Sequence, residues 1–454
     1  MAGMSFTADV AAEVAAIDYA DLSPAVRERG RHVVLDWLGA TIAGSVEESA
    51  RIAQGYALAE GGAPVATLVG TPHRVAAGVA ALANGIASHA LDYDDGSLWT
   101  DGHPSAAIVS AALAVGEREG ASWADIVEAI VAGVQGQARI AQACGRSAYE
   151  HGFHGTGIYG AFGAAGAAGR LLGLDAEALQ RAYGLAATQA AGLKASFGTM
   201  GKHLNAAGAA RDGLLAAELA ARGFTAPPDA VEARQGFAAT HSTTWDPDRP
   251  AQSMGDRLAI ESILFKRHAC CAGTHSAVEG ILRLRAEHGF EADDVAAVQL
   301  LVSERLPDVC GIHEPRTGLE GKFSIRYASS LALAGRDTGP AAFTDEAVNE
   351  PGMVALRDRV TVVPEAGRAA TTPTTVVVDL VGGERLQVEV STVEFVRDED
   401  LPAQWTALAA KFAGLAEPVL GEDGARRLVD AVADLESGAP ADLLAHTAPP
   451  LATV

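Results

Sequence analysis

The chain has 454 residues, and its 34 lysines and arginines against 57 aspartates and glutamates give a formal net charge of −23. Such an acidic excess excludes a protein whose main partner is nucleic acid or an anionic membrane. Hydrophobic residues make up 49% and charged residues 20%, which indicates a folded chain with a large core. The length favours two domains.

Cysteine content and the N-terminus bear on the compartment. The chain has four cysteines, Cys144, Cys270, Cys271 and Cys310. Four cysteines are too few for a disulfide framework in a chain of this size, so we expect reduced thiols. The first 22 residues lack a basic start and carry acidic side chains through their apolar stretch, so neither a signal peptide nor a transit peptide fits. We therefore predict a cytoplasmic protein.

The N-terminal half has the pattern of a helical domain. Apolar residues recur three and four positions apart, which predicts helices over residues 27–43, 75–89, 106–119 and 123–144. Residues 155–172 are nearly free of charge, and their glycines recur every third position. We predict a buried central helix here and not a membrane span, because Arg170 and the acidic flanks give no membrane topology.

The C-terminal half changes character after a proline-rich linker at residues 226–250. Runs of β-branched residues predict strands at 295–302, 360–363, 376–381 and 386–390, the last two flanking a Gly-Gly turn. Helices are expected at 324–334, 346–359 and 403–444. We predict a mainly α protein with two parts: a discontinuous all-helical domain (1–255 and 399–454) and a smaller α+β domain (256–398).

The first candidate for chemistry is an acidic run that follows a predicted helix. Asp92, Asp94 and Asp95 precede a glycine-containing loop and His103. In a buried site, three such carboxylates cannot all ionise without raising at least one pKa, so the run offers acid and base groups. The alternative is a helix end with a solvated acidic loop.

Two glycine-rich turns add imidazoles and a cation. His154 stands between glycines before the central helix, where backbone N–H groups and the helix dipole favour an anion. This turn matches neither a Walker loop nor a dinucleotide fingerprint. Lys202 and His203 form a second pair in a glycine-rich turn. The alternative for the second pair is an ordinary helix start with exposed polar residues.

The scarcity of lysine draws attention to a third segment. The chain has only five lysines, and four of them lie between residues 194 and 322. A desolvated lysine can lose its proton, which arginine cannot do. Lys266 and Arg267 precede Cys270-Cys271 and His275. Adjacent cysteines bind one zinc ion poorly and no Cys-x-x-Cys occurs, so we expect no metal and instead a cationic lip for a carboxylate.

Through the order of these motifs, the sequence resembles the MmgE/PrpD family. Members of that family include 2-methylcitrate dehydratase, cis-aconitate decarboxylase and iminodisuccinate epimerase. The resemblance rests on 90–95, 103–105, 153–157, 201–205, 266–275 and Glu320-Gly321-Lys322-Phe323-Ser324. It implies an all-helical domain with a smaller α+β lid, a homodimer, and a site between the domains that needs no metal or organic cofactor. Two departures are Gly96, where many members have threonine, and Cys271, where the animal decarboxylase has histidine.

The resemblance also implies which residues form the site. The expected catalytic residues are Asp92, His103, His154, Lys202 and Lys266. The expected substrate-binding residues are His203, Arg267, Cys271, His275 and Lys322.

Chemistry next to a carboxylate suggests how these residues would act. Such reactions pass through an enolate-like carbanion, so the site must hold negative charge and exchange a proton. We therefore expect a cofactor-independent lyase on a small di- or tricarboxylate, either a 2-methylcitrate-type dehydratase or a cis-aconitate-type decarboxylase. The lysines and Arg267 would bind carboxylates, while His103 and His154, oriented by Asp92, would exchange protons. The alternatives are an epimerase of an iminodisuccinate-like dicarboxylate and a non-catalytic binding protein.

Overall fold

A glycine- and alanine-rich helix, α8 (Gly155–Leu171), forms the centre of the helical domain in the computed structural model, which describes residues 5–97, 99–369, 372–391, 400–435 and 438–449. The helices packed around it are α5 (Pro104–Glu119), α6 (Trp123–Cys144), α9 (Ala176–Ala187) and α10 (Gly201–Ala221). Glycine permits the close approach of α8 and α10, because a Cβ built on Gly213 would lie 2.4 Å from the carbonyl oxygen of Ala161.

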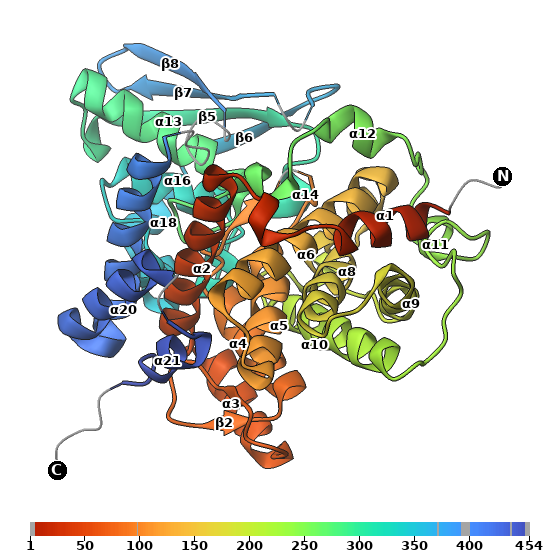
Figure 1. The fold of residues 1–454 in the computed structure, drawn as a ribbon. Helices are drawn as coiled ribbons and strands as arrows, with labels where there is room; N and C mark the ends of the chain where they lie inside the picture. Colours follow the sequence, from red (N-terminus) through yellow and green to blue (C-terminus); the bar gives the residue numbers. More distant parts are fainter. Residues whose placement is uncertain (1–4, 98, 370–371, 392–399, 436–437, 450–454) are drawn as a thin grey trace.

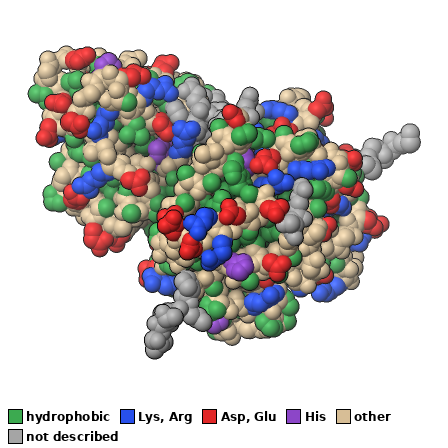
Figure 2. All heavy atoms as spheres, turned by 60° about the vertical axis from the view of Figure 1, so that its left-hand side comes forward, with side chains coloured by type: hydrophobic (Ala, Val, Ile, Leu, Met, Phe, Trp, Pro, Cys, Tyr) green, Lys and Arg blue, Asp and Glu red, His purple; other side chains and the backbone are tan. Residues whose placement is uncertain are grey.

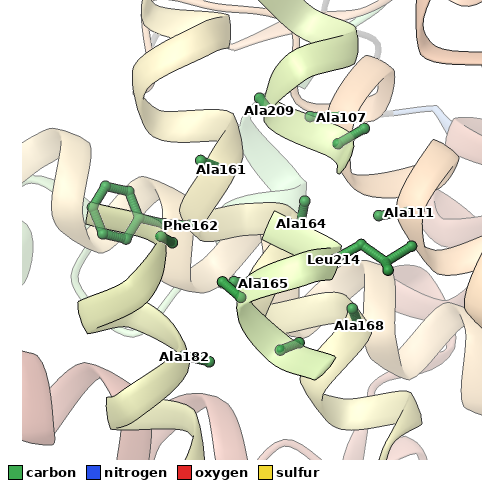
Figure 3. Close-up of a cluster of buried hydrophobic side chains, with 14 of the residues drawn as sticks. Ala107, Ala111, Ala161, Phe162, Ala164, Ala165, Ala168, Ala182, Ala209 and Leu214 are labelled. Carbon is green, nitrogen blue, oxygen red and sulfur yellow. The ribbon is translucent and has the colours of Figure 1, made fainter. Parts of the chain in front are cut away.

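Alanine fills most of the space between these helices (Figure 3). The fully buried members of this cluster include Ala107 and Ala111 from α5, Ala161, Ala164, Ala165 and Ala168 from α8, and Ala210 from α10. Residues 155–171 therefore form a buried helix, as predicted. Within the described part of the chain, no helix has both the length and the hydropathy that crossing a bilayer requires.

The remaining helices of this domain surround that centre (Figure 1). They are α1 (Phe6–Ala15), α2 (Pro24–Gly44), α3 (Glu48–Glu60), α4 (Ala77–His89), α7 (Ser147–His151), α11 (Phe237–His241), α12 (Arg249–Met254), α20 (Leu401–Ala433) and α21 (Pro440–Ala445). The side chain of Ser23 accepts a hydrogen bond from Val26 N and so caps α2. The C-terminal α20 packs against α2, so the end of the chain returns to the helical domain.

A four-stranded mixed sheet organises the second domain. Strand β5 (Val295–Ser303) runs parallel to β6 (Val360–Glu365) and antiparallel to β7 (Thr374–Leu380), which forms a hairpin with β8 (Arg385–Val390). The hairpin turn includes Gly383 at a φ of +92°, which glycine adopts without strain. The predicted strands and the fold class, a large helical domain plus a smaller α+β domain, are confirmed.

Helices α13 (Ala272–His288) and α16 (Ile325–Leu333) pack against this sheet (Figure 1). The shorter helices of the domain are α14 (Pro307–Cys310), α15 (Gly318–Gly321), α17 (Asp345–Val348) and α18 (Pro351–Arg357). The single helix predicted over 346–359 is wrong. Glu350 is extended before Pro351, because proline disfavours the helical conformation of the residue before it, and this breaks the segment into α17 and α18.

Short strands and a shared core join the two domains. β3 (Gly96–Ser97), in the acidic loop, pairs with β4 (Ile263–Leu264). Ala259, Ile260, Ile263 and Phe265 belong to the core around α2, so this segment packs with the helical domain. The domain limits remain a prediction, and the one at residues 398–399 lies outside the described residues. β1 (Ala66–Thr67) and β2 (Arg74–Val75) form a further pair.

Candidate active site

The acidic run begins directly after α4. Asp92 has a φ of +49°, an uncommon value for a residue with a side chain, and its N–H is bonded to the carbonyl of His89. The loop then returns to α5, whose N-cap is His103. His103 Nδ1 lies 2.6 Å from the carbonyl oxygen of Asp95, so this nitrogen donates to it. The strained turn and the return of the loop thus place a carboxylate and an imidazole together.

Two lysines from distant segments meet on Asp92. Lys202, at the start of α10, places Nζ 2.6 Å from Asp92 Oδ1, and Lys266 Nζ lies 3.1 Å from the same oxygen. Lys266 also donates to the Asp92 carbonyl at 2.7 Å. All three side chains are 3% exposed. Burial alone would raise the pKa of Asp92, but the two ammonium groups hold it well below its usual range.

A buried imidazole lies behind Lys202. His89 Nε2 is 2.7 Å from Lys202 Nζ, and His89 Nδ1 is 2.7 Å from Asp94 Oδ2. Burial opposes ionisation of Asp94, yet His89 and His103 outweigh it and lower the pKa of this carboxyl. Asp95 differs, because burial together with the charges of Asp36 and Asp94 raises its pKa well above the usual value. Within this run, the surroundings thus favour the ionised form of Asp92 and Asp94 and the protonated form of Asp95.

Two further imidazoles face this centre and are held neutral. The ring centroids of His103 and His154 are 6.5 Å apart. Burial, reinforced by Lys202 and Lys266, lowers the pKa of His103 well below its usual range. Burial and Lys202 do the same for His154. Asn205 Nδ2 lies 3.2 Å from His154 Nδ1, so this nitrogen accepts and Nε2 carries the hydrogen.

These groups line one side of a cavity of about 580 Å³, which lies between the two domains. This volume lies within the range of small-molecule sites. The helical domain contributes Asp92, His103, His154 and Lys202, and the later segments contribute Lys266 and residues of α13, β5 and β7. Further out, the lining includes Arg146, Lys194, Arg305 and Arg368 together with Asp101, Glu150, Glu304 and Asp308.

The structure brings most of the predicted site residues together. All five expected catalytic residues line the cavity, as do Cys271 and His275. His203 and Lys322 are buried beside it but are not among the described lining residues. His203 Nδ1 is 2.9 Å from Ser49 Oγ, while Lys322 Nζ donates to the carbonyls of Leu91 and Ala269.

Arg267 does not form the predicted cationic lip. Its side chain is 55% exposed, lies 3.8 Å from Glu279, and is not among the described residues that line the cavity. The chain bends at Arg267, shortly after β4 ends, so Lys266 stays buried at the site while the Arg267 side chain is turned toward solvent.

Several residues of the site were missed from the sequence. His89 and Asn205 both orient a cavity group, and Arg146, Lys194, Arg305 and Arg368 add cations farther out. A signal existed for His89, since it ends a predicted helix next to the acidic run. Among the outer cations, Lys194 had a signal in the scarcity of lysine, whereas the three arginines had none, because they come from three separate segments. On the face shown in Figure 2, acidic and basic side chains are interspersed, without a continuous field of either sign.

Four side chains around Asp92 are of types that can bind a metal ion. His89, Asp92, Asp94 and His103 each offer one ligand atom, and these atoms lie within 4.8 Å of one another. However, the ammonium group of Lys202 already donates to Asp92 and contacts His89, and Lys266 donates to Asp92 as well. A divalent cation would face two buried ammonium groups, so the residues present do not fit a metal.

Two models of one protein family match most of the chain. The MmgE/PrpD N-terminal domain matches residues 8–250, and the MmgE/PrpD C-terminal domain matches residues 268–437. Cis-aconitate decarboxylase-like protein oryM of Aspergillus oryzae is 25% identical over 95% of this chain and 95% of its own. Cis-aconitate decarboxylase of Aspergillus terreus is 26% identical over 75% of this chain and 74% of its own. The human cis-aconitate decarboxylase is 27% identical over 78% of this chain and 76% of its own. The chain therefore belongs to the MmgE/PrpD family, as the order of its motifs predicted.

Proposed function

We propose that this protein is a lyase that acts, without a metal or organic cofactor, on a small di- or tricarboxylate. The observation that carries the proposal is the pair of buried ammonium groups on Asp92, which lie with two neutral imidazoles in the lining of one cavity. The candidate reactions are decarboxylation of a cis-aconitate-type substrate and dehydration of a 2-methylcitrate-type substrate. The names of the relatives favour a lyase of this kind.

The lysines would hold the substrate carboxylates and stabilise the charge that develops. In a decarboxylation, the C–C bond to the departing CO2 breaks and its electron pair moves onto the neighbouring carbon, as an enolate-like anion. Lys202 and Lys266 are fixed before the substrate arrives, so they can lower the energy of this anion without reorganising. Protonation of the carbon then completes the reaction.

The histidines would carry the protons. For a dehydration, a neutral imidazole removes the proton next to the carboxylate, and an acid gives a proton to the hydroxyl group that leaves as water. His103 and His154 are neutral when the cavity is empty, which suits the base. His154 carries its hydrogen on Nε2, and Lys202 is an ammonium donor, so the acid is also available.

Proton NMR of the purified protein in deuterated buffer tests the reaction class. The panel contains cis-aconitate, citrate, 2-methylcitrate and iminodisuccinate. New vinyl signals with release of CO2 identify a decarboxylase, and new vinyl signals without CO2 identify a dehydratase. Absence of any change across the panel contradicts the proposed substrate class.

An epimerase is the second candidate, because the site holds two imidazoles that could act on opposite faces of one carbon. His103 and His154 are separated by 6.5 Å between ring centroids, with their planes inclined at 68°. In the same NMR experiment an epimerase exchanges one C–H for deuterium and inverts that carbon, without loss of water or CO2. We also propose, from the family resemblance, that the protein is a homodimer, and light scattering on the purified protein would test this. Its location is proposed to be the cytoplasm.

A further inference from the structure

Two cysteines lie close together at the cavity, one in its lining and one buried behind it. Cys271 is the N-cap of α13 and lines the cavity, whereas Cys310 ends α14 and is fully buried. The Cys310 thiol donates to the carbonyl oxygen of Leu306, at 3.8 Å, and also shares a side-chain hydrogen bond with Cys271. A Cβ built on Gly273 would lie 3.2 Å from Cys310 Sγ and 3.7 Å from Cys271 Sγ. Both sulfur atoms therefore lie beside the same glycine.

The two thiols differ in acidity and access. The hydrogen bond with Cys310 lowers the pKa of Cys271 against the effect of burial, and Lys266 lowers it further. Cys271 also stands at the positive end of a 17-residue helix, which favours a thiolate. The same hydrogen bond, together with burial, raises the pKa of Cys310 well above its usual value. Cys271 thus has the properties of an attacking thiol, and the position of Cys310 beside it allows Cys310 to resolve the product.

We propose that Cys271 and Cys310 form an oxidation site for a small hydroperoxide that enters the cavity. The Cys271 thiolate attacks a peroxide oxygen, which gives a sulfenic acid and releases hydroxide. Cys310 sulfur then attacks the Cys271 sulfur, the S–O bond breaks, and the oxygen leaves as water. In total, two thiols and one molecule of hydrogen peroxide give one disulfide and two molecules of water.

The chain supplies two matched control cysteines. Cys270 is the neighbour of Cys271 in sequence, but its sulfur lies 3.0 Å from Thr274 Oγ1, and burial raises the pKa of this thiol to about 12. Cys144 is buried in α6, and burial raises its pKa to about 12 as well. Neither residue lines the cavity among the described residues. Both should therefore remain thiols under conditions that oxidise Cys271.

Peptide mapping of the full-length protein tests the proposal. The reduced protein is treated with hydrogen peroxide, remaining thiols are blocked with N-ethylmaleimide, and the digest is analysed by mass spectrometry. We expect a disulfide between the peptides of Cys271 and Cys310, formed equally in Cys270→Ser and Cys144→Ser and removed by dithiothreitol. In Cys310→Ser the disulfide disappears, and dimedone traps a sulfenic acid on Cys271.

Three results would overturn the oxidation site. They are full alkylation of all four cysteines after peroxide, a disulfide that involves Cys270, or no dimedone adduct on Cys271 in Cys310→Ser. The readout requires no catalytic activity, so it stands apart from the test of the proposed function. Circular dichroism of each variant before oxidation checks that the fold is intact.

Discussion

His89 Nε2 lies 2.7 Å from Lys202 Nζ, at the end of a buried chain that starts at Asp94. A carboxylate only accepts hydrogen bonds, so His89 Nδ1 donates to Asp94 and Nε2 presents its lone pair to Lys202. Lys202 donates in addition to Asp92. The imidazole thereby fixes the direction in which the buried Lys202 side chain points.

This arrangement makes His89 a positioning residue. We predict that His89→Gln lowers kcat by about 100-fold with a much smaller change in KM, because the ammonium group loses its fixed direction. The pH profile of kcat should shift as well, since the lysine loses a neighbour that accepts its hydrogen bond. Steady-state kinetics over a range of pH provides the measurement.

A matched control for that variant is His32→Gln. His32 is also a fully buried imidazole, and its Nδ1 lies 2.7 Å from Gln404 Oε1, in the core around α2. Its replacement should change stability but not the pH profile of kcat. Equal kinetic effects of the two substitutions would contradict the role of His89.

Binding of a polycarboxylate should take up protons. In the empty cavity Asp92 and Asp94 balance Lys202 and Lys266, and the histidines are neutral. An added polyanion favours imidazolium, so it raises the low pKa of His103 and His154 in the complex. Affinity should therefore strengthen as the pH falls through the range of about 8 to 5, in which imidazoles that have regained an ordinary pKa titrate in the complex.

Calorimetric titration with a tricarboxylate, in two buffers of different ionisation enthalpy, measures this proton uptake. His103→Gln should reduce the uptake and flatten the dependence of Kd on pH. A Kd independent of pH together with a heat independent of buffer would show that the imidazoles stay neutral, against the proposed balance of charges.

Two glycines of α10 give a test of the helical packing. A Cβ on Gly213 would lie 2.4 Å from the Ala161 carbonyl oxygen, whereas one on Gly208 would have only Asp212 Oδ2 as a neighbour, at 4.0 Å. We predict that Gly213→Ala lowers the free energy of unfolding by about 1–3 kcal/mol through overpacking. Gly208→Ala should raise it by about 1 kcal/mol through helix propensity. Urea unfolding of both variants provides the comparison, and destabilisation of the same size in each would refute the close contact.

Metal removal should leave the activity unchanged. The four candidate ligand atoms around Asp92 share their space with two ammonium groups, and this disfavours a divalent ion. Activity after dialysis against EDTA should equal that of the untreated protein. A loss that returned on addition of one divalent metal would contradict this assignment.

Local patterns in the sequence predicted the fold well. The helices α5, α6 and α8 follow from apolar and glycine periodicity, and the hairpin follows from its Gly-Gly turn. Pro351 shows the limit of periodicity, because one residue interrupts a segment whose apolar spacing alone predicts a continuous helix. Helix α13 was not predicted, since its start was interpreted only as a site motif.

The site could be predicted only in part, because its contacts are tertiary. Asp92, Lys202 and Lys266 are far apart in sequence, and only the family resemblance grouped them. Arg267 shows why adjacency misleads, since Lys266 is buried in the site while the next side chain along the chain is exposed beside Glu279. His89 is the opposite case, because this neighbour of the acidic run does belong to the site. It does so through its contact with Asp94, which the sequence does not reveal.

The most direct measurement is the NMR time course of the substrate found in the panel, recorded for the wild-type protein and for Lys202→Met and His154→Gln. The proposed lyase predicts that the wild-type protein forms the product, while each variant is slower by about 100-fold or more and keeps the wild-type circular dichroism spectrum. Wild-type rates in both folded variants would show that the cavity around Asp92 is not where the chemistry occurs.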